Sequence, residues 1–232
     1  MSSTRSRTSP LRTNIAAMSL VQISNYLLPL ITLPYLTRVL GAEAFGKVAF
    51  AQILMSYLVL LVDYGFSWSA TRAVAADRND SEKISLIFTA TWATQWLLLA
   101  LAMAIAVPTI LLADRLRPDA WLYAAGFTSV IGGTLFPVWF LQGLERLEVV
   151  AMLQLVARIL ALPAIFLLIG EPEDGIWVLL INGAASILSG IAALAWLWRQ
   201  RVVRWAWPGW LNLFDAIRDG GPLFASRISI SL

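Results

Sequence analysis

Six long apolar segments constrain this chain more than any other feature, because each is long enough to cross a bilayer as a helix that rises 1.5 Å per residue. The segments cover residues 14–37, 46–70, 85–112, 120–142, 148–169 and 176–198. Charged residues make up only 13% of the chain, whereas a soluble domain carries roughly a quarter. We therefore predict an all-α integral membrane protein with a six-helix transmembrane bundle over residues 14–198.

The flanking residues predict three further regions. Residues 1–13 are basic and form the expected cytoplasmic N-terminus, and residues 221–232 read as the start of a seventh spanning helix in a longer protein. Residues 199–220 contain Trp205, Trp207 and Trp210, and tryptophan is enriched at membrane interfaces. We expect this region to be an amphipathic interfacial linker; the alternative is an ordinary solvated loop.

The distribution of Lys and Arg predicts a cytoplasmic N-terminus, because cytoplasmic loops carry an excess of these residues. With that orientation, cytoplasmic segments hold eleven of them: Arg5, Arg7, Arg12, Arg72, Arg78, Lys83, Arg146, Arg199, Arg201, Arg204 and Arg218. The outer segments hold Arg38, Lys47, Arg115 and Arg117. A signal peptide is the competing interpretation of the first segment, but that segment is longer than a signal core of about 7–15 residues.

Several kinds of chemistry are excluded by composition. The chain has no Cys and no His, so it offers no thiol nucleophile, no histidine base and no His/Cys metal site. Asp63 is the carboxylate that falls inside a hydrophobic segment, near its cytoplasmic end, and there is no Gly-rich phosphate loop. We expect neither an enzyme nor a cofactor or metal site in these residues. The basic pI reflects membrane topology, and we expect no nucleic-acid partner.

The first span carries a stripe of polar residues, Gln22, Asn25 and Tyr26, at helical spacing. Such a stripe lines a cavity or holds helices together by hydrogen bonds, and the sequence leaves both open. Pro29 and Pro34 follow in the same span. Because proline removes a backbone donor, we expect a bend there, either a flexing hinge or a static kink.

Arg158 lies about ten residues into the fifth span, roughly 15 Å deep. An arginine at that depth costs about 2.5–3.5 kcal/mol on insertion scales and usually faces a cavity or a partner. Gln154, one turn earlier, shares its helix face. We predict a cavity-lining role, with pairing to a neighbouring helix as the alternative. Arg227, in the seventh run, is a second candidate or a snorkelling anchor.

The segment FPVWFLQGLERLEVV at residues 136–150 forms a tight corner between two spans. Trp139 and Phe140 suit a membrane interface, and Gly143 allows a sharp reversal. Glu145 is expected to favour the N-terminus of the next helix. Beyond this structural role, Gln142 and Arg146 are candidate ligand contacts, because the corner lies on the predicted cytoplasmic side.

Two other corners carry helix-end signals. Gly41 is suited to a left-handed conformation at the end of the first span. Asn79-Asp80-Ser81-Glu82 supplies capping residues before the third span.

Three motifs together resemble the polysaccharide repeat-unit flippases (Wzx type), the polysaccharide biosynthesis protein family. They are LPYLTRVLGAEAFG at residues 33–46, DYGF at 63–66 followed by ATR at 70–72, and FPVWFLQGLE at 136–145. The resemblance implies a protein about twice as long, with two six-helix bundles and both ends cytoplasmic. Its implied location is the bacterial inner membrane, as a multi-pass protein.

The implied function is to move undecaprenyl-diphosphate-linked oligosaccharide repeat units from the inner to the outer leaflet by alternating access. The implied partners are this lipid-linked oligosaccharide and the bilayer, with a polysaccharide polymerase and chain-length machinery as further candidates. We predict a ladder of positive charge for the diphosphate, since arginine holds phosphate bidentately. Its members are Arg72, Arg146 and Arg227 near the cytoplasmic side, Arg158 at mid-depth and Arg38 near the outer side.

Two other functions remain open. A multidrug or cation antiporter of the same superfamily would normally need buried carboxylates, and only Asp63 is offered here. A membrane enzyme acting on lipid-linked glycans would need catalytic groups in a long outer loop, and the predicted outer loops are short.

Overall fold

The part of the chain that the structure describes is built from helices and contains no strand. The structure is a computed structural model that describes the backbone of residues 8–203 and the side chains of residues 30–203. The helices are α1 (Thr8–Asp63), α2 (Phe66–Ala76), α3 (Ser81–Leu112), α4 (Ala120–Leu135), α5 (Val138–Gly143), α6 (Leu147–Leu168) and α7 (Gly175–Arg199). Two 3-10 turns, η1 (Arg117–Asp119) and η2 (Pro172–Asp174), precede α4 and α7.

Five stretches of the described residues are helical, long and apolar enough to cross a membrane. They are Leu30–Ala76, Ser81–Leu112, Arg117–Gly143, Leu147–Leu168 and Pro172–Arg199. This agrees with the predicted all-α membrane fold. The number of six spanning helices and the cytoplasmic N-terminus stay predictions. The interfacial linker and the seventh helix fall almost entirely on residues 204–232, outside the described part.

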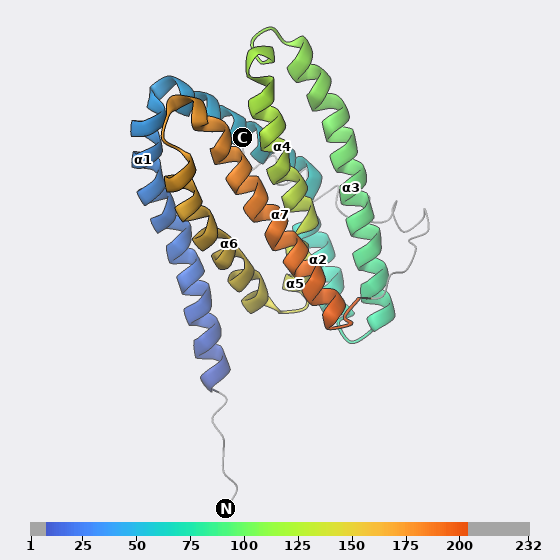
Figure 1. The fold of residues 1–232 in the computed structure, drawn as a ribbon. Coiled ribbons are helices and arrows are strands. Elements are labelled where there is room, and N and C mark those ends of the chain that lie inside the picture. The colour runs from blue at the N-terminus through green and yellow to red at the C-terminus, as the bar shows by residue number, and fades with distance from the viewer. Residues whose placement is uncertain (1–7, 204–232) are drawn as a thin grey trace, which may run out of the picture.

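The helices run up and down the bundle, so that the connections gather at two ends (Figure 1). The bend of α1, the α3–α4 corner and the α6–α7 corner lie at the upper end, and the α2–α3 and α5–α6 corners at the lower end. Helices α4 and α7 make the most extensive contact, and α6 packs on both α7 and α1. This alternation matches the predicted alternation of loops across the bilayer.

Helices α4 and α7 approach closely because small residues line their contact. A Cβ added at Gly183 of α7 would collide with the Thr128 hydroxyl of α4, and one added at Gly132 would lie 2.6 Å from the Ser186 Cβ. Within a membrane, where lipid is as apolar as a core side chain, such close backbone packing is a main source of helix association. It places Ser186 of α7 directly beside α4.

Gly41 divides α1 into two arms. At Gly41 the backbone leaves the helical conformation, with φ of 72° and ψ of 173°. The predicted positive φ at Gly41 is confirmed, although ψ is extended rather than left-handed helical, a combination that is essentially restricted to glycine. Pro29 and Pro34 lie within the helical first arm, and a hinge at either stays a prediction.

Two predicted spans are interrupted where the sequence suggested continuous helix. The second breaks at Tyr64 and Gly65, which have φ of 43° and 83°, so α2 is a separate helix. The fourth breaks between α4 and α5 at Pro137, because proline has no N–H to continue the ladder. The Asp80 cap is confirmed: its carboxylate accepts hydrogen bonds from the backbone N–H groups of Glu82 and Lys83, both at 3.1 Å.

Replacing Gly41 with Ala should destabilise the protein, because an L side chain at these dihedrals costs about 1–3 kcal/mol. No neighbouring atom lies within 4 Å of a Cβ at Gly41, so strain rather than collision is the expected cause. Thermal unfolding of the purified protein in detergent should show an apparent Tm lower by several degrees.

Gly46→Ala is the matched control. Gly46 is also free of neighbours within 4 Å of an added Cβ but lies in the helical second arm, where Ala is preferred over Gly by about 0.5–1 kcal/mol. Its Tm should stay the same or rise. Equal behaviour of the two variants would contradict the strain at Gly41.

Candidate functional site

A cavity of about 780 Å³ opens between the second arm of α1 and helices α2 to α7. We call it the polar cavity, after the side chains in its lining: Ser56, Asp63, Ser67, Gln95, Thr134, Gln154 and Ser186. Tyr57, Phe136 and Trp139 add aromatic surface. Among the residues that the structure describes, its lining contains one carboxylate and no Lys or Arg. It is therefore a site with hydrogen-bonding walls and little charge.

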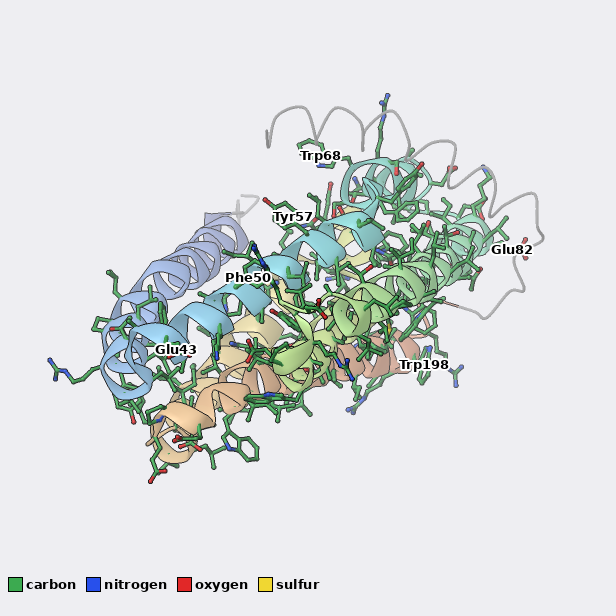
Figure 2. All side chains as sticks on the ribbon, turned by 90° about the horizontal axis from the view of Figure 1, so that it is seen from above. Glu43, Phe50, Tyr57, Trp68, Glu82 and Trp198 are labelled. Carbon is green, nitrogen blue, oxygen red and sulfur yellow. The ribbon has the colours of Figure 1, made fainter. Side chains whose placement is uncertain are left out.

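The second arm of α1 borders this cavity and also has an exposed apolar face. Glu43, Phe50, Tyr57 and Trp68 follow one another from the kink of α1 to α2 (Figure 2). Phe50, Ile53 and Tyr57 are at least half exposed, at spacings of three and four that put them on one face. Ile53 and Tyr57 also line the polar cavity, so its edge continues into an apolar surface.

Trp139 and Gln95 meet inside the bundle, next to the polar cavity. The Trp139 indole N–H donates a hydrogen bond to Gln95 Oε1 at 3.2 Å. Trp139 is only 3% exposed and Gln95 only 6%. Both residues line the cavity, so this hydrogen bond lies in its buried wall.

The prediction that Trp139 and Phe140 lie at the membrane interface is wrong. Phe140 is fully buried, and both rings pack on Phe88 of α3, with centroid distances of 6.1 Å for Trp139 and 4.8 Å for Phe140. The break at Pro137 turns α5 inward, where these rings fill space between helices. Gln95 was not among the predicted site residues; an amide in the middle of an apolar span was the signal that could have found it.

The structure does not bring the predicted ligand residues together. Arg38, Arg72 and Arg146 are exposed near the ends of the bundle, and Gln142 is half-buried in α5. Arg158 is half-buried in α6, but it does not belong to the lining of the polar cavity, whereas Gln154 does. The side chains of Gln22, Asn25 and Tyr26, and all of Arg227, lie outside the described part. The role of each of these residues stays a prediction.

The α5–α6 corner is docked onto α2. The Thr71 hydroxyl donates to the Trp139 carbonyl at 3.0 Å. A Cβ at Gly143 would lie 2.7 Å from the Val74 Cβ and 2.9 Å from the Thr71 carbonyl oxygen. Gly143 is thus needed for close helix packing, while the residue of this corner with positive φ is Glu145, at 58°.

Glu145 forms an ion pair with Arg78, with an N–O distance of 2.6 Å, and links the corner to the end of α2. Hydrogen bonding to the Arg78 guanidinium, together with its positive charge, lowers the pKa of Glu145. Glu145 directly precedes the N-cap residue Arg146 of α6, and the acidic residue in the first turn is Glu148; an effect of Glu145 on this helix end stays a prediction. Glu148 also lies 3.6 Å from Arg146.

The opposite end of the bundle holds a second charged contact. Lys47 lies 3.2 Å from Glu43 on its own helix and 3.6 Å from Asp119, which precedes α4. A cavity of about 560 Å³ is bounded there by these residues and by Glu173. Three corners predicted to lie outside therefore share one end.

Long apolar helices around a polar cavity define a multi-pass membrane protein. Comparison with known sequences then assigns the family: the profile described as polysaccharide biosynthesis protein matches residues 11–232, and the chain belongs to that family. No solved structure matches the chain.

Two curated relatives carry the same name, "Putative O-antigen transporter". The one from Escherichia coli (strain K12) is 31% identical over 227 residues, which are 96% of this chain and 54% of the relative. The one from Shigella dysenteriae is 28% identical over 224 residues, 96% of this chain and 56% of the relative. The chain thus spans about half the length of these relatives.

Reversing the Arg78–Glu145 pair should separate its structural role from any role in ligand binding. Arg78→Glu and Glu145→Arg alone should each lower the apparent Tm, since each places like charges together, and the double reversal should recover part of the loss. The exposed pair makes the expected effects small. Single variants that match the double variant would argue against a direct pairing.

The pH dependence has a defined sign. Because the pKa of Glu145 is lowered by the fold, its contribution is present above the unfolded pKa of about 4.3. It is lost as pH falls through the lower folded value. The Tm difference between wild type and Glu145→Gln should stay constant from pH 7 to 5 and shrink below pH 4.

Proposed function

We propose that this bundle belongs to a transporter that moves undecaprenyl-diphosphate-linked oligosaccharide repeat units from the inner to the outer leaflet of the bacterial inner membrane. The observation that carries the proposal is the family membership, together with relatives named as O-antigen transporters. We further propose that the N-terminus is cytoplasmic and that transport proceeds by alternating access.

The polar cavity supports this proposal by its chemistry. A saccharide is covered with hydroxyl groups that both donate and accept hydrogen bonds, and it presents C–H faces that pack on aromatic rings. Neutral amides and hydroxyls next to Tyr57 and Trp139 suit both features. Such groups replace the water that a glycan loses when it enters hydrocarbon, where an unpaired polar group costs several kcal/mol.

The diphosphate needs different side chains, since its charge must be neutralised. We propose Arg72 and Arg146 at one end of the bundle, Arg38 toward the other and Arg158 between them. The remaining proposed ligand contacts are Gln142, which is half-buried, and Gln22, Asn25, Tyr26 and Arg227. We propose no enzymatic step. A polymerase and chain-length machinery would receive the product at the outer leaflet.

A cation-coupled antiporter is the second candidate, and one observation favours it. Asp63 lines the polar cavity and accepts a hydrogen bond from the Ser67 hydroxyl at 2.6 Å. A carboxylate in that position could bind a cation that drives export of another solute.

Deletion of the gene in its native host should cause complete repeat units to accumulate on the polyprenyl lipid, with loss of surface polymer. Extraction and mass spectrometry of the lipid-linked glycans would measure this and identify the cargo. An unchanged pool and unchanged polymer, combined with greater sensitivity to cationic dyes, would overturn the flippase proposal and favour the antiporter.

Arg158→Ala should impair complementation of that deletion, since loss of a charge-assisted hydrogen bond of about 1.5–3 kcal/mol corresponds to roughly tenfold or more in transport. Arg158→Lys should restore only part of it, because an ammonium lacks the bidentate fork. Arg115→Ala, at the exposed α3–α4 corner, is the control. Full complementation by Arg158→Ala at normal protein level would remove Arg158 from the ligand site.

A further inference from the structure

The orientation of the Gln95 amide is fixed by its neighbour. An indole N–H can only donate, so the hydrogen bond from Trp139 must end on the amide oxygen, as the 3.2 Å contact shows. The Gln95 Nε2 group, with two N–H donors, then points away from Trp139. Within the described residues it has no protein acceptor.

A donor group in this position is unusual. Gln95 is only 6% exposed, and a buried donor without an acceptor is destabilising. Most buried polar side-chain atoms in proteins are paired for this reason. Because Gln95 lines the polar cavity, an acceptor on a molecule inside the cavity would satisfy it.

Two further side chains in the lining have hydrogen-bonding capacity to spare. Gln154 of α6 and Ser186 of α7 are half-buried, and neither makes a side-chain hydrogen bond to another described residue. They come from helices different from that of Gln95, so three elements each contribute a neutral polar group to one cavity. An amide can donate and accept, and so can a hydroxyl.

Charge decides which part of a ligand this constellation fits. The described lining contains Asp63 and no Lys or Arg. Neutral amides and hydroxyls match sugar hydroxyls, whereas a diphosphate needs positive charge to offset its own. Asp63 can instead accept hydrogen bonds from hydroxyl groups, as it does from Ser67.

We infer that Gln95, held by Trp139, forms with Gln154 and Ser186 a subsite that binds sugar hydroxyls of the glycan and excludes the diphosphate. The inference rests on the proposed function and deepens it, since it separates the glycan subsite from the arginines proposed for the diphosphate. Gln95 Nε2 donates to a hydroxyl oxygen, and Trp139 serves as the positioning residue.

The test uses purified full-length protein in lipid nanodiscs and two probes. One is the repeat-unit oligosaccharide released by mild acid from the lipid-linked pool of the host, and the other is inorganic pyrophosphate. Gln95→Glu keeps an acceptor for Trp139 but removes both N–H donors. It should weaken oligosaccharide binding at least tenfold, measured by calorimetry, and leave pyrophosphate binding unchanged.

Gln154→Leu should weaken oligosaccharide binding severalfold without lowering the Tm, because Gln154 has no described partner to lose. If Gln95→Glu fails to fold, Gln154→Leu still tests the subsite. Thr94→Val is the matched control: Thr94 is a buried neighbour whose hydroxyl donates to the Ala90 carbonyl at 2.8 Å and does not line the cavity.

The outcomes separate the subsite from the function. Wild-type binding that persists in both Gln95→Glu and Gln154→Leu overturns the subsite and leaves the flippase proposal intact. Equal weakening of pyrophosphate binding also overturns it. Failure of wild type to bind the oligosaccharide, with no accumulation of repeat units in the deletion strain, overturns both.

Discussion

Inside hydrocarbon every backbone N–H and C=O group must find a partner, and this requirement shapes the bundle wherever a helix stops within it. The Trp92 indole donates to the Thr134 carbonyl at 3.1 Å, near the end of α4. The Tyr35 hydroxyl donates to the Ile169 carbonyl at 2.6 Å, at the end of α6. Each of these bonds joins two helices, and the first also holds α3 against Thr134, which lines the polar cavity.

The motifs that carry the family resemblance serve this same purpose. Thr71, from the second motif, donates to the carbonyl of Trp139, from the third, and Gly143 allows α5 to approach α2. Docked in this way, α5 presents the Trp139 indole to Gln95. The aromatic residues, the glycine and Glu145 of the corner are therefore explained by packing and by the ion pair with Arg78. Gln142 and Arg146 remain available for the proposed contact with the ligand.

Much of the fold could be predicted because apolar length and helix-capping residues are local properties. The predicted span 148–169 lies within one residue of α6, and Asp80 caps α3 as expected. Burial could not be predicted in the same way, because lipid and protein core are equally apolar. Trp139 is a residue type that suits both a membrane interface and a buried core. Arg158 was singled out by its charge at that depth, whereas Gln95, in similarly hydrophobic surroundings, is uncharged and did not stand out.

Separation of the glycan from the diphosphate has a consequence for the proposed transport cycle. A carrier must bind its cargo firmly enough to admit it and weakly enough to release it. Hydrogen bonds between neutral groups contribute only about 0.5–1.5 kcal/mol each, so a glycan in the polar cavity would be replaceable by water when the cavity opens. A diphosphate held by bidentate arginine in low dielectric would be released far more slowly. Arg38, Arg72 and Arg146, exposed near the ends of the bundle, avoid that trap because water screens their charge. The described lining of the polar cavity offers the diphosphate no positive charge in its place.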